Sequence, residues 1–283
     1  MSSTEGPGTN HHDSRIGEQR SRATGISVIS RRPAAPPPCS DGARTTHPSA
    51  AAAHRGPLLA VCGLCGGAGA STLAYLTAVA QARRGTGAVL VADTGGPTAG
   101  ISHYAGVQAP RSLAEAAEQV QTSLPTGQLI ATTCDGLRVL ATAPTLSATC
   151  SREGVELLLE HARERYTLTV IDCGTLARDA DQIALANATH VAWVLPATAG
   201  AVNRGRQLLN VIAPHRSGRE LLVAHHDPRE PKTALRELRD LARDRHAPLI
   251  LLPSVPEVAR GDAAAALETA QVTLEAILGA VWR

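Results

Sequence analysis

A glycine-rich stretch, residues 62–72, constrains the fold of this 283-residue chain more than any other feature. It reads CGLCGGAGAST, follows the apolar run 58–61 and precedes a helical pattern that begins near Ala70. Its glycines can adopt backbone angles that other residues avoid, and they let the main chain approach a ligand closely. A strand, a glycine loop and a helix N-terminus, in this order, bring backbone N–H groups together around a phosphate. The stretch therefore predicts an anion site at a strand-to-helix turn.

The loop resembles the deviant Walker A motif of the ParA/MinD superfamily of P-loop ATPases. That motif has a signature lysine before Gly-Gly-x-Gly and a second lysine before Thr/Ser-Thr. In this chain Cys65 stands at the first lysine position and Ala70 at the second, and Lys232 is the only lysine in the sequence. The resemblance implies that the loop binds the phosphates of ATP. The expected binding residues are Cys65, Gly66, Gly67, Ala68, Gly69, Ala70, Ser71 and Thr72.

Two aspartates follow apolar runs further along the chain. Asp93 ends the run VLVAD, and Asp172 ends LTVID. An aspartate after a strand is usually a turn residue, but Asp93 comes one strand–helix–strand unit after the glycine loop. In the resemblance, Asp93 corresponds to the aspartate near the γ-phosphate and the attacking water, and Gly95 replaces a second aspartate of that motif. Asp172 matches the Walker B aspartate, which holds Mg²⁺ directly or through water. We therefore predict Asp93 as the catalytic residue and Ser71 and Asp172 as metal ligands.

A late loop completes the expected nucleotide site. In ParA/MinD relatives this loop passes the base of the nucleotide, so Pro253 and Val255 are expected to contact it. Relatives often place an asparagine that reads adenine after the preceding strand. Residues 225–227 of this chain are His-His-Asp instead.

Apolar runs alternate with helical patterns from Pro57 onward. This alternation predicts an α/β fold with a mainly parallel sheet and helices on both faces, which is the three-layer P-loop NTPase fold that the resemblance also implies. Ligands of such sheets bind at the carboxyl ends of the strands. The expected strands are 58–63, 88–92, 137–141, 167–172, 190–195, 220–225 and 248–252, and the expected helices are 70–84, 112–123, 151–166, 179–187, 199–212, 231–245 and 261–281.

Residues 1–56 have a different composition, rich in Ser, Pro, Gly, His and Arg. Such a segment buries too little apolar surface to offset the entropy lost on ordering. We predict a disordered tail over 1–56, followed by one ParA/MinD-like domain over 57–283. Arg31-Arg32 precedes proline-rich sequence and no apolar region, which argues against an export signal. No apolar run approaches the roughly 20 residues that span a bilayer. We therefore expect a cytoplasmic protein without an intrinsic membrane anchor.

Charge and cysteine content limit the alternatives. A net charge of +2 argues against a dedicated nucleic-acid binder. The basic face of helix 231–245 is interleaved with acidic residues, which favours a salt-bridged solvent face, so DNA binding is possible but not favoured. Cys62 and Cys65 form a CxxC motif, which leaves a redox or metal protein as a remote alternative. Against it, the helix starts five residues after Cys65 and no second CxxC completes a zinc site.

The missing lysines bear on whether the chain hydrolyses ATP or only binds it. The backbone anion site survives their loss, but a charge-assisted hydrogen bond contributes about 1.5–3 kcal/mol. Nucleotide binding should weaken by roughly one to two orders of magnitude. Hydrolysis should suffer more, because the cation stabilises charge that grows in the transition state. We therefore expect weak binding of ATP with Mg²⁺ and little turnover.

The leading hypothesis is a nucleotide-binding or pseudo-ATPase protein of the TadZ/CpaE type. Residues 135–144 look like the strand that precedes the Walker B unit in that branch, which tends to lose signature lysines. The resemblance implies a homodimer that positions a secretion, pilus or conjugation machine and is recruited to the membrane or cell pole by that partner. The second hypothesis is an active ATPase of the partitioning or septum-site type, in which Arg111, Arg204 or Arg206 replaces the lysines. The third is the CxxC redox or metal protein.

Overall fold

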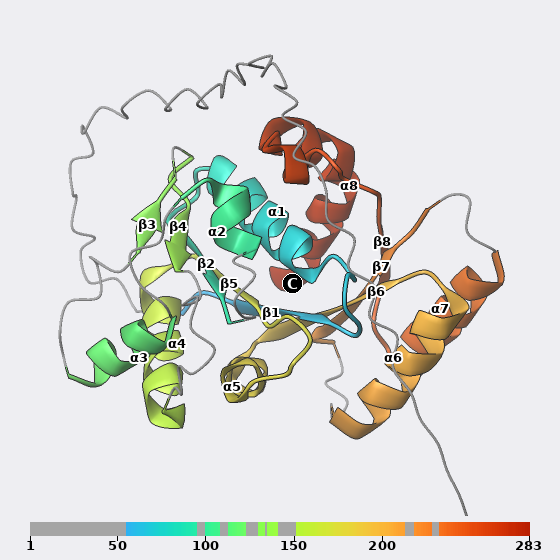
Figure 1. Ribbon diagram of the computed structural model, residues 1–283, viewed down its shortest axis with the longest axis horizontal. Helices are drawn as coiled ribbons and strands as arrows, with labels where there is room; N and C mark the ends of the chain where they lie inside the picture. Colours follow the sequence, from blue (N-terminus) through green and yellow to red (C-terminus); the bar gives the residue numbers. More distant parts are fainter. Residues whose placement is uncertain are drawn as a thin grey trace, which may run out of the picture. The chain divides into compact units, whose positions relative to one another are not determined.

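The computed structural model describes residues 55–94, 100–107, 113–122, 130–133, 135–140, 151–212, 218–227 and 232–283. These residues form an eight-stranded sheet with helices on both faces (Figure 1). The predicted α/β class is therefore confirmed. The predicted tail, 1–56, lies outside the described residues except for its last two. There, Arg55 forms exposed ion pairs with Glu160 at 3.1 Å and with Glu164 at 3.3 Å, and the Gly56 amide donates to the Arg163 carbonyl.

Every strand and helix expected from the sequence is present, with bounds within two residues of the prediction. Among the described residues, the additions are a two-residue strand, a six-residue helix and a 3₁₀ turn. In chain order the elements are β1 (Leu58–Gly63), α1 (Ala70–Arg83), β2 (Val89–Asp93), α2 (Gly100–Ala105), α3 (Leu113–Gln121), β3 (Ala131–Thr132), β4 (Arg138–Leu140), α4 (Arg152–Arg165), β5 (Leu168–Asp172), α5 (Asp179–Asn187), β6 (His190–Pro196), α6 (Ala199–Ile212), β7 (Glu220–His225), α7 (Lys232–Asp244), β8 (Leu249–Leu252), η2 (Val258–Arg260) and α8 (Ala263–Val281).

The strand order β3-β4-β2-β5-β1-β6-β7-β8 puts β1 at the centre of the sheet. All described pairings are parallel except that of the edge strand β3 with β4. β1 pairs with β5 on one side, where Val61 faces Asp172, and with β6 on the other. Because parallel neighbours end at the same edge, the glycine loop and both predicted aspartates leave the sheet on one side.

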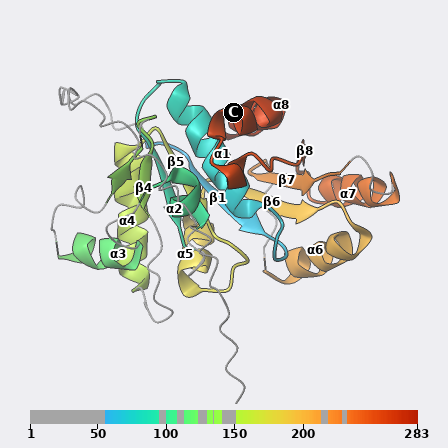
Figure 2. The same ribbon diagram turned by 45° about the horizontal axis from the view of Figure 1, so that its top comes forward.

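Two layers of helices cover the sheet (Figures 1 and 2). Alternate β1 residues point to opposite faces, so Leu58 and Ala60 pack with α3–α7, whereas Leu59 and Val61 pack with α1, α2 and α8. Both faces of β1 are therefore apolar, as expected of a central parallel strand. The sequence contains no Phe, and Trp193 is the largest fully buried side chain in the described part of the chain.

Helix α8 corrects one expectation from the sequence. By length and composition its 19 residues could cross a membrane, although we expected no such run. Buried core helices pass the same test, and one face of α8, including Ala270, Leu274 and Ile277, is buried against α1 and β8. This packing makes α8 part of the helical layer on that face of the sheet.

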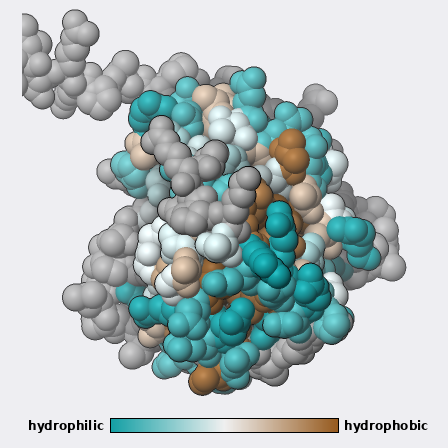
Figure 3. Space-filling model, turned by 90° about the vertical axis from the view of Figure 1, so that its right-hand side faces the viewer, coloured by the Kyte–Doolittle hydropathy of each residue, from teal (hydrophilic) through white to brown (hydrophobic). Residues whose placement is uncertain are grey.

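The side of the molecule that carries α6 and α7 is mainly hydrophilic (Figure 3). On α7, Arg243 and Asp240 form an exposed ion pair at 2.9 Å. The sequence analysis missed a buried pair next to it. Arg245 donates two hydrogen bonds of 2.7 Å to Glu220, which is 2% exposed, and a third of 3.3 Å to the Leu209 carbonyl. This arginine links the end of α7 to the start of β7 and to α6.

Candidate functional site

The glycine loop joins the end of β1 to the start of α1. Gly67 and Gly69 have φ angles of 72° and 91°, in the left-handed region that favours glycine. Gly69 is the N-cap of α1 and provides no side-chain cap. The first turn of a helix has N–H groups without intrahelical partners, so α1 offers donors at this point. They border a hollow of about 390 Å³ lined by the loop.

Helix α2 closes one side of this hollow. No element was expected between strand 88–92 and helix 112–123, but residues 100–105 form a short helix. A Cβ at Gly100 would lie 3.3 Å from the Ser71 Cβ, so α2 begins directly against the phosphate loop. Tyr104 lines the hollow, and its ring centroid lies 5.8 Å from that of Tyr75 on α1. The hollow is therefore shaped by two elements that are far apart in the sequence.

Asp172, Asp93 and Ser71 come together at the edge of the hollow. Asp93 and Asp172 are register partners on β2 and β5 and are 3% and 1% exposed. The Ser71 side chain hydrogen-bonds Asp172, and the Gly174 amide donates to its Oδ1 at 3.1 Å. Burial, and then the charge of Asp93, raise the pKa of Asp172 from 3.8 to about 6. A buried carboxylate whose charge is disfavoured by burial and by a second carboxylate suits a cation.

The structure adds residues that the sequence analysis missed. Asp181, in the first turn of α5, is 1% exposed, and burial raises its pKa to about 6. Its Oδ2 accepts a hydrogen bond of 2.9 Å from the Arg178 amide. Thr94 donates from its hydroxyl to the Asp172 carbonyl at 2.8 Å and accepts at its own carbonyl from Arg178 at 3.4 Å. The one sequence signal at Asp181 is its position, three residues after the helix N-cap Arg178. An acidic residue there indicates the start of a helix, but it does not indicate a binding site.

A second hollow, of about 220 Å³, adjoins the first. Loop residues Gly67, Gly69 and Thr72 line one side of it. The other side comes from the carboxyl ends of β7 and β8 and the late loop, with Val255 among its lining residues and Pro253 not. This hollow lies where the resemblance places the base of a nucleotide. Its far wall consists of His225, Leu252, Ser254, Val255 and Pro256.

The three arginines proposed as substitute cations have different positions. Arg111 lies outside the described residues. Arg204 and Arg206 are both exposed on α6. Burial raises the pKa of the Cys65 thiol, and the positive charge of Arg204 acts in the opposite direction. Arg204 is therefore electrostatically coupled to the residue that stands at the signature-lysine position.

The cysteines do not form the pair that the CxxC motif suggests. Cys62 is buried on β1, as expected, and its thiol contacts that of Cys173, which follows β5. The hydrogen bond with Cys62, followed by burial, raises the pKa of the Cys173 thiol. Cys62, Cys65 and Cys173 are all free thiols. No group of three or more His, Cys, Asp or Glu residues in the described part of the chain could hold a metal ion through protein ligands alone.

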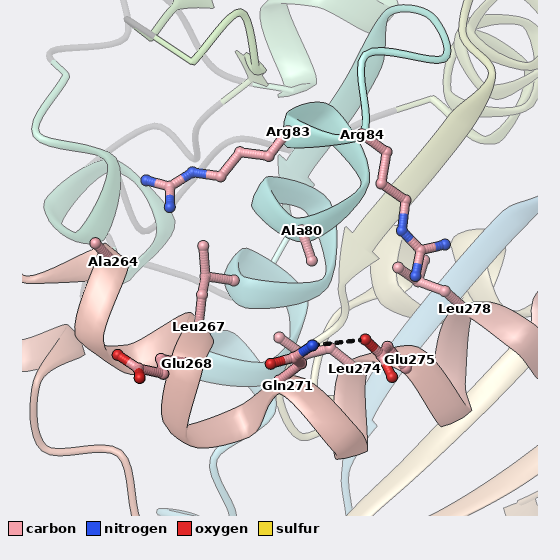
Figure 4. A pocket seen from close by; sticks show the side chains of 10 residues that line it. All are labelled: Ala80, Arg83, Arg84, Ala264, Leu267, Glu268, Gln271, Leu274, Glu275 and Leu278. Atoms are coloured by element: carbon pink, nitrogen blue, oxygen red, sulfur yellow. Dashed lines mark hydrogen bonds between the residues drawn. The ribbon is translucent and has the colours of Figure 1, made fainter.

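A third hollow, of about 410 Å³, lies between α1 and α8 (Figure 4). Arg83 and Arg84 extend from α1 on one side, and Glu268 and Glu275 extend from α8 on the other. It lies beside the end of α1 that is remote from the loop, about 20 Å along the helix at 1.5 Å per residue. This groove is therefore separate from the phosphate loop.

Comparison with known proteins gives a fold. No protein-family model matches the chain, and no curated protein sequence matches it. Among solved structures, a ParA family ATPase from Chlorobium tepidum TLS matches with a TM-score of 0.66 and 16% identity over 80% of this chain and 98% of that one. The MinC:MinD cell division protein complex of Aquifex aeolicus matches with a TM-score of 0.62 and 15% identity, over 79% of this chain and 96% of the matched chain. The ATP complex of a Cyanothece McdA variant matches with a TM-score of 0.61 and 14% identity, over 81% of this chain and 97% of that one. The chain thus has the P-loop NTPase fold of the ParA and MinD ATPases.

Proposed function

We propose that this chain is a ParA/MinD-like protein that binds ATP with Mg²⁺ at the carboxyl edge of β1, β2 and β5. The observation that carries the proposal is the hydrogen bond between Ser71, at the start of α1, and Asp172, at the end of β5. This bond joins the hydroxyl and the carboxylate that the resemblance implies as Mg²⁺ ligands. Both lie beside the glycine loop and the first turn of α1, whose N–H groups lack intrahelical partners. Oxygen ligands of this kind, together with phosphate oxygens, suit Mg²⁺.

The ATP molecule would use both hollows. Its phosphates would lie against the loop from Cys65 to Thr72, and its base would enter the adjoining hollow near Val255. Asp93 would orient an attacking water. Its buried carboxylate, beside Asp172 at the same edge of the sheet, supports this role. The McdA neighbour is a complex with ATP, which supports this class of ligand for the fold.

We further propose weak binding and little hydrolysis. No lysine or arginine lines the phosphate hollow within the described residues, because Cys65 and Ala70 occupy the two lysine positions. Loss of the cation affects the transition state more than the bound ground state, since charge grows during phosphoryl transfer. The leading role is then that of a nucleotide-dependent or pseudo-ATPase positioning factor of the TadZ/CpaE type.

Such a factor would act as a homodimer on a protein partner in a membrane-associated secretion, pilus or conjugation machine, which would recruit it to the membrane or cell pole. The MinD neighbour is found in a complex with MinC, which supports protein partners for this fold. DNA is not favoured, because the exposed charges on α7 include an internal Arg243–Asp240 ion pair. An active ATPase remains the second candidate, and the coupling of Arg204 to Cys65 is the observation that favours it.

Calorimetric titration of the full chain with ATP and Mg²⁺ tests nucleotide binding. We expect weak binding by the native protein and tighter binding by the Ala70→Lys variant, which restores the P-loop lysine. Val272→Lys is the matched control, because Val272 is 80% exposed on α8 and the variant adds the same charge outside the loop. Ser71→Ala should reduce the Mg²⁺-dependent part of the binding. If neither the native protein nor Ala70→Lys binds ATP, the nucleotide proposal is wrong.

Turnover and oligomeric state test the remaining parts. Phosphate release well below one per minute in the native protein, rising in Ala70→Lys, would support a pseudo-ATPase. Fast release by the native protein would contradict it and favour the active ATPase. Light scattering with and without ATP then shows whether a dimer forms.

A further inference from the structure

The phosphate hollow lacks a positive charge of its own. Its described lining consists of loop residues with Tyr104, Gly174 and Thr175, and none of them is a lysine or arginine. The carboxylates of Asp93 and Asp172 lie at the same edge of the sheet. A phosphate group here would meet backbone donors but also nearby negative charge. A cation that reaches the loop from another element would correct this imbalance.

Helix α6 is the element that packs directly against the start of the loop. The Leu64 amide donates to the Val194 carbonyl at 2.8 Å, which ties the loop to the end of β6. A Cβ at Gly205 of α6 would lie 3.2 Å from both the Leu64 Cδ1 and the Leu195 Cδ1. Only a glycine allows α6 to approach this closely without displacing its neighbours. The close approach places α6, which carries Arg204 and Arg206 on either side of Gly205, beside the start of the loop.

Arg204 is available to bind a ligand. Within the described residues it makes no hydrogen bond or ion pair, whereas Arg178 already donates to the Thr94 carbonyl and Arg245 is paired with Glu220. Its charge acts on the Cys65 thiol, and Cys65 lines the phosphate hollow. Arg206, two positions further along α6, points in a different direction, since residues two apart do not share a helix face.

We propose that Arg204 supplies, from α6, the positive charge that the loop lacks at Cys65, and that its guanidinium binds phosphate oxygens of the nucleotide. The inference rests on the proposed nucleotide binding and adds a binding residue to that site. A guanidinium presents several N–H donors in a fixed plane and matches phosphate oxygens in pairs. An arginine on a neighbouring helix can therefore take over the charge of a lysine within the loop.

The first test is a titration of the full-length variants with ATP and Mg²⁺. Arg204→Ala should weaken binding by about 10-fold or more, the effect of a lost charge-assisted hydrogen bond. Arg206→Ala is the matched control and should bind like the native protein, because it removes the same exposed side chain from the same helix. Adding Cys65→Lys to the Arg204→Ala variant should restore affinity. Equal affinities of Arg204→Ala and Arg206→Ala would overturn the proposal.

The second test needs no nucleotide and reports the charge at the loop. The rate of Cys65 alkylation by iodoacetamide follows its thiolate fraction, and mass spectrometry of the peptide separates Cys65 from the other cysteines. Arg204→Ala should slow this reaction a few-fold at pH 8, and Arg206→Ala should leave it unchanged. If the native chain binds no ATP, the proposed function fails and the phosphate role of Arg204 fails with it, whatever the alkylation shows. If ATP binds and alkylation is unaffected by Arg204→Ala, only the present inference is overturned.

Discussion

Replacing Asp172 by asparagine should stabilise the protein at neutral pH when no nucleotide or Mg²⁺ is added. The carboxyl is 1% exposed, and burial, followed by repulsion from Asp93, raises its pKa from 3.8 to about 6. A shift of one pKa unit corresponds to about 1.4 kcal/mol, so holding the charge in the folded state costs about 3 kcal/mol above pH 7. Asparagine removes the charge and keeps the Oδ1 that accepts from the Gly174 amide. Since its amide group must find new partners, we expect a gain of about 1–3 kcal/mol.

The pH dependence follows from the same shift. The folded chain binds the Asp172 proton more tightly than the unfolded chain does, so the free energy of unfolding rises as the pH falls from 7 toward 5. The advantage of Asp172→Asn should therefore be largest above pH 7 and should shrink below pH 6. The pKa of Asp181 is also raised to about 6, and its charge contributes to the shift of Asp172. Asp181 titrates in both proteins, so their difference reports Asp172 together with its interaction with Asp181.

Urea unfolding followed by circular dichroism at pH 7.5 and pH 5.5 gives the gain in the free energy of unfolding and its change with pH. Asp240→Asn is the control, because it removes one charge from an exposed ion pair and should change stability by less than about 1 kcal/mol at either pH. An Asp172→Asn variant that is less stable than the native protein at pH 7.5 would refute the reasoning. A difference that does not change with pH would refute the attribution to ionisation.

Two other substitutions and one treatment test further contacts that the structure shows. Arg245→Ala should destabilise the fold by about 3–5 kcal/mol in urea unfolding, because it removes the bidentate partner of the buried Glu220 carboxylate. Arg243→Ala is the control: it breaks an exposed ion pair and should cost less than about 1 kcal/mol. Gly205→Val should cost about 1–3 kcal/mol in the same assay, since the added atoms meet the glycine loop and β6, and a smaller effect would place α6 further from the loop. ATP with Mg²⁺ should slow alkylation of Cys65 in peptide mass spectrometry, because Cys65 lines the phosphate hollow; an unchanged rate would contradict that placement.

The layered fold could be predicted because its elements are encoded locally. β1, β5 and β6 are continuous apolar runs, which is what burial on both faces of a parallel sheet requires. The glycine loop and the two aspartates lie at strand ends, and parallel topology brings such ends to one edge. α2 could not be predicted in the same way. Its six residues are too few for a helical period to be visible, and its buried residue, Ile101, packs in the core that α1 also contributes to.

Contacts between elements that are far apart in the sequence could not be predicted either. Periodicity tells which face of a helix is buried, but it does not name the partner of that face. Glu220 and Arg245 are 25 positions apart, and neither residue type is expected in a core. The role of Gly205 in α6 has no signal in the sequence, because it depends on the distance to Leu64. The partner of Cys62 is likewise Cys173, which follows the neighbouring strand β5, and not Cys65 of the same CxxC motif.

The charge distribution at the site implies a strong requirement for the metal. Asp93, Asp172 and Asp181 are buried at the edge that would receive the phosphates, and the loop contains no lysine. Free ATP would bring negative charge toward carboxylates, whereas Mg²⁺ held by Ser71 and Asp172 would cancel two charges at the point of contact. In Ala70→Lys the loop itself would carry part of that compensation. We therefore expect removal of Mg²⁺ by a chelator to weaken ATP binding more in the native chain than in Ala70→Lys. An equal loss in both would mean that the loop backbone and Arg204 already balance the phosphate charge.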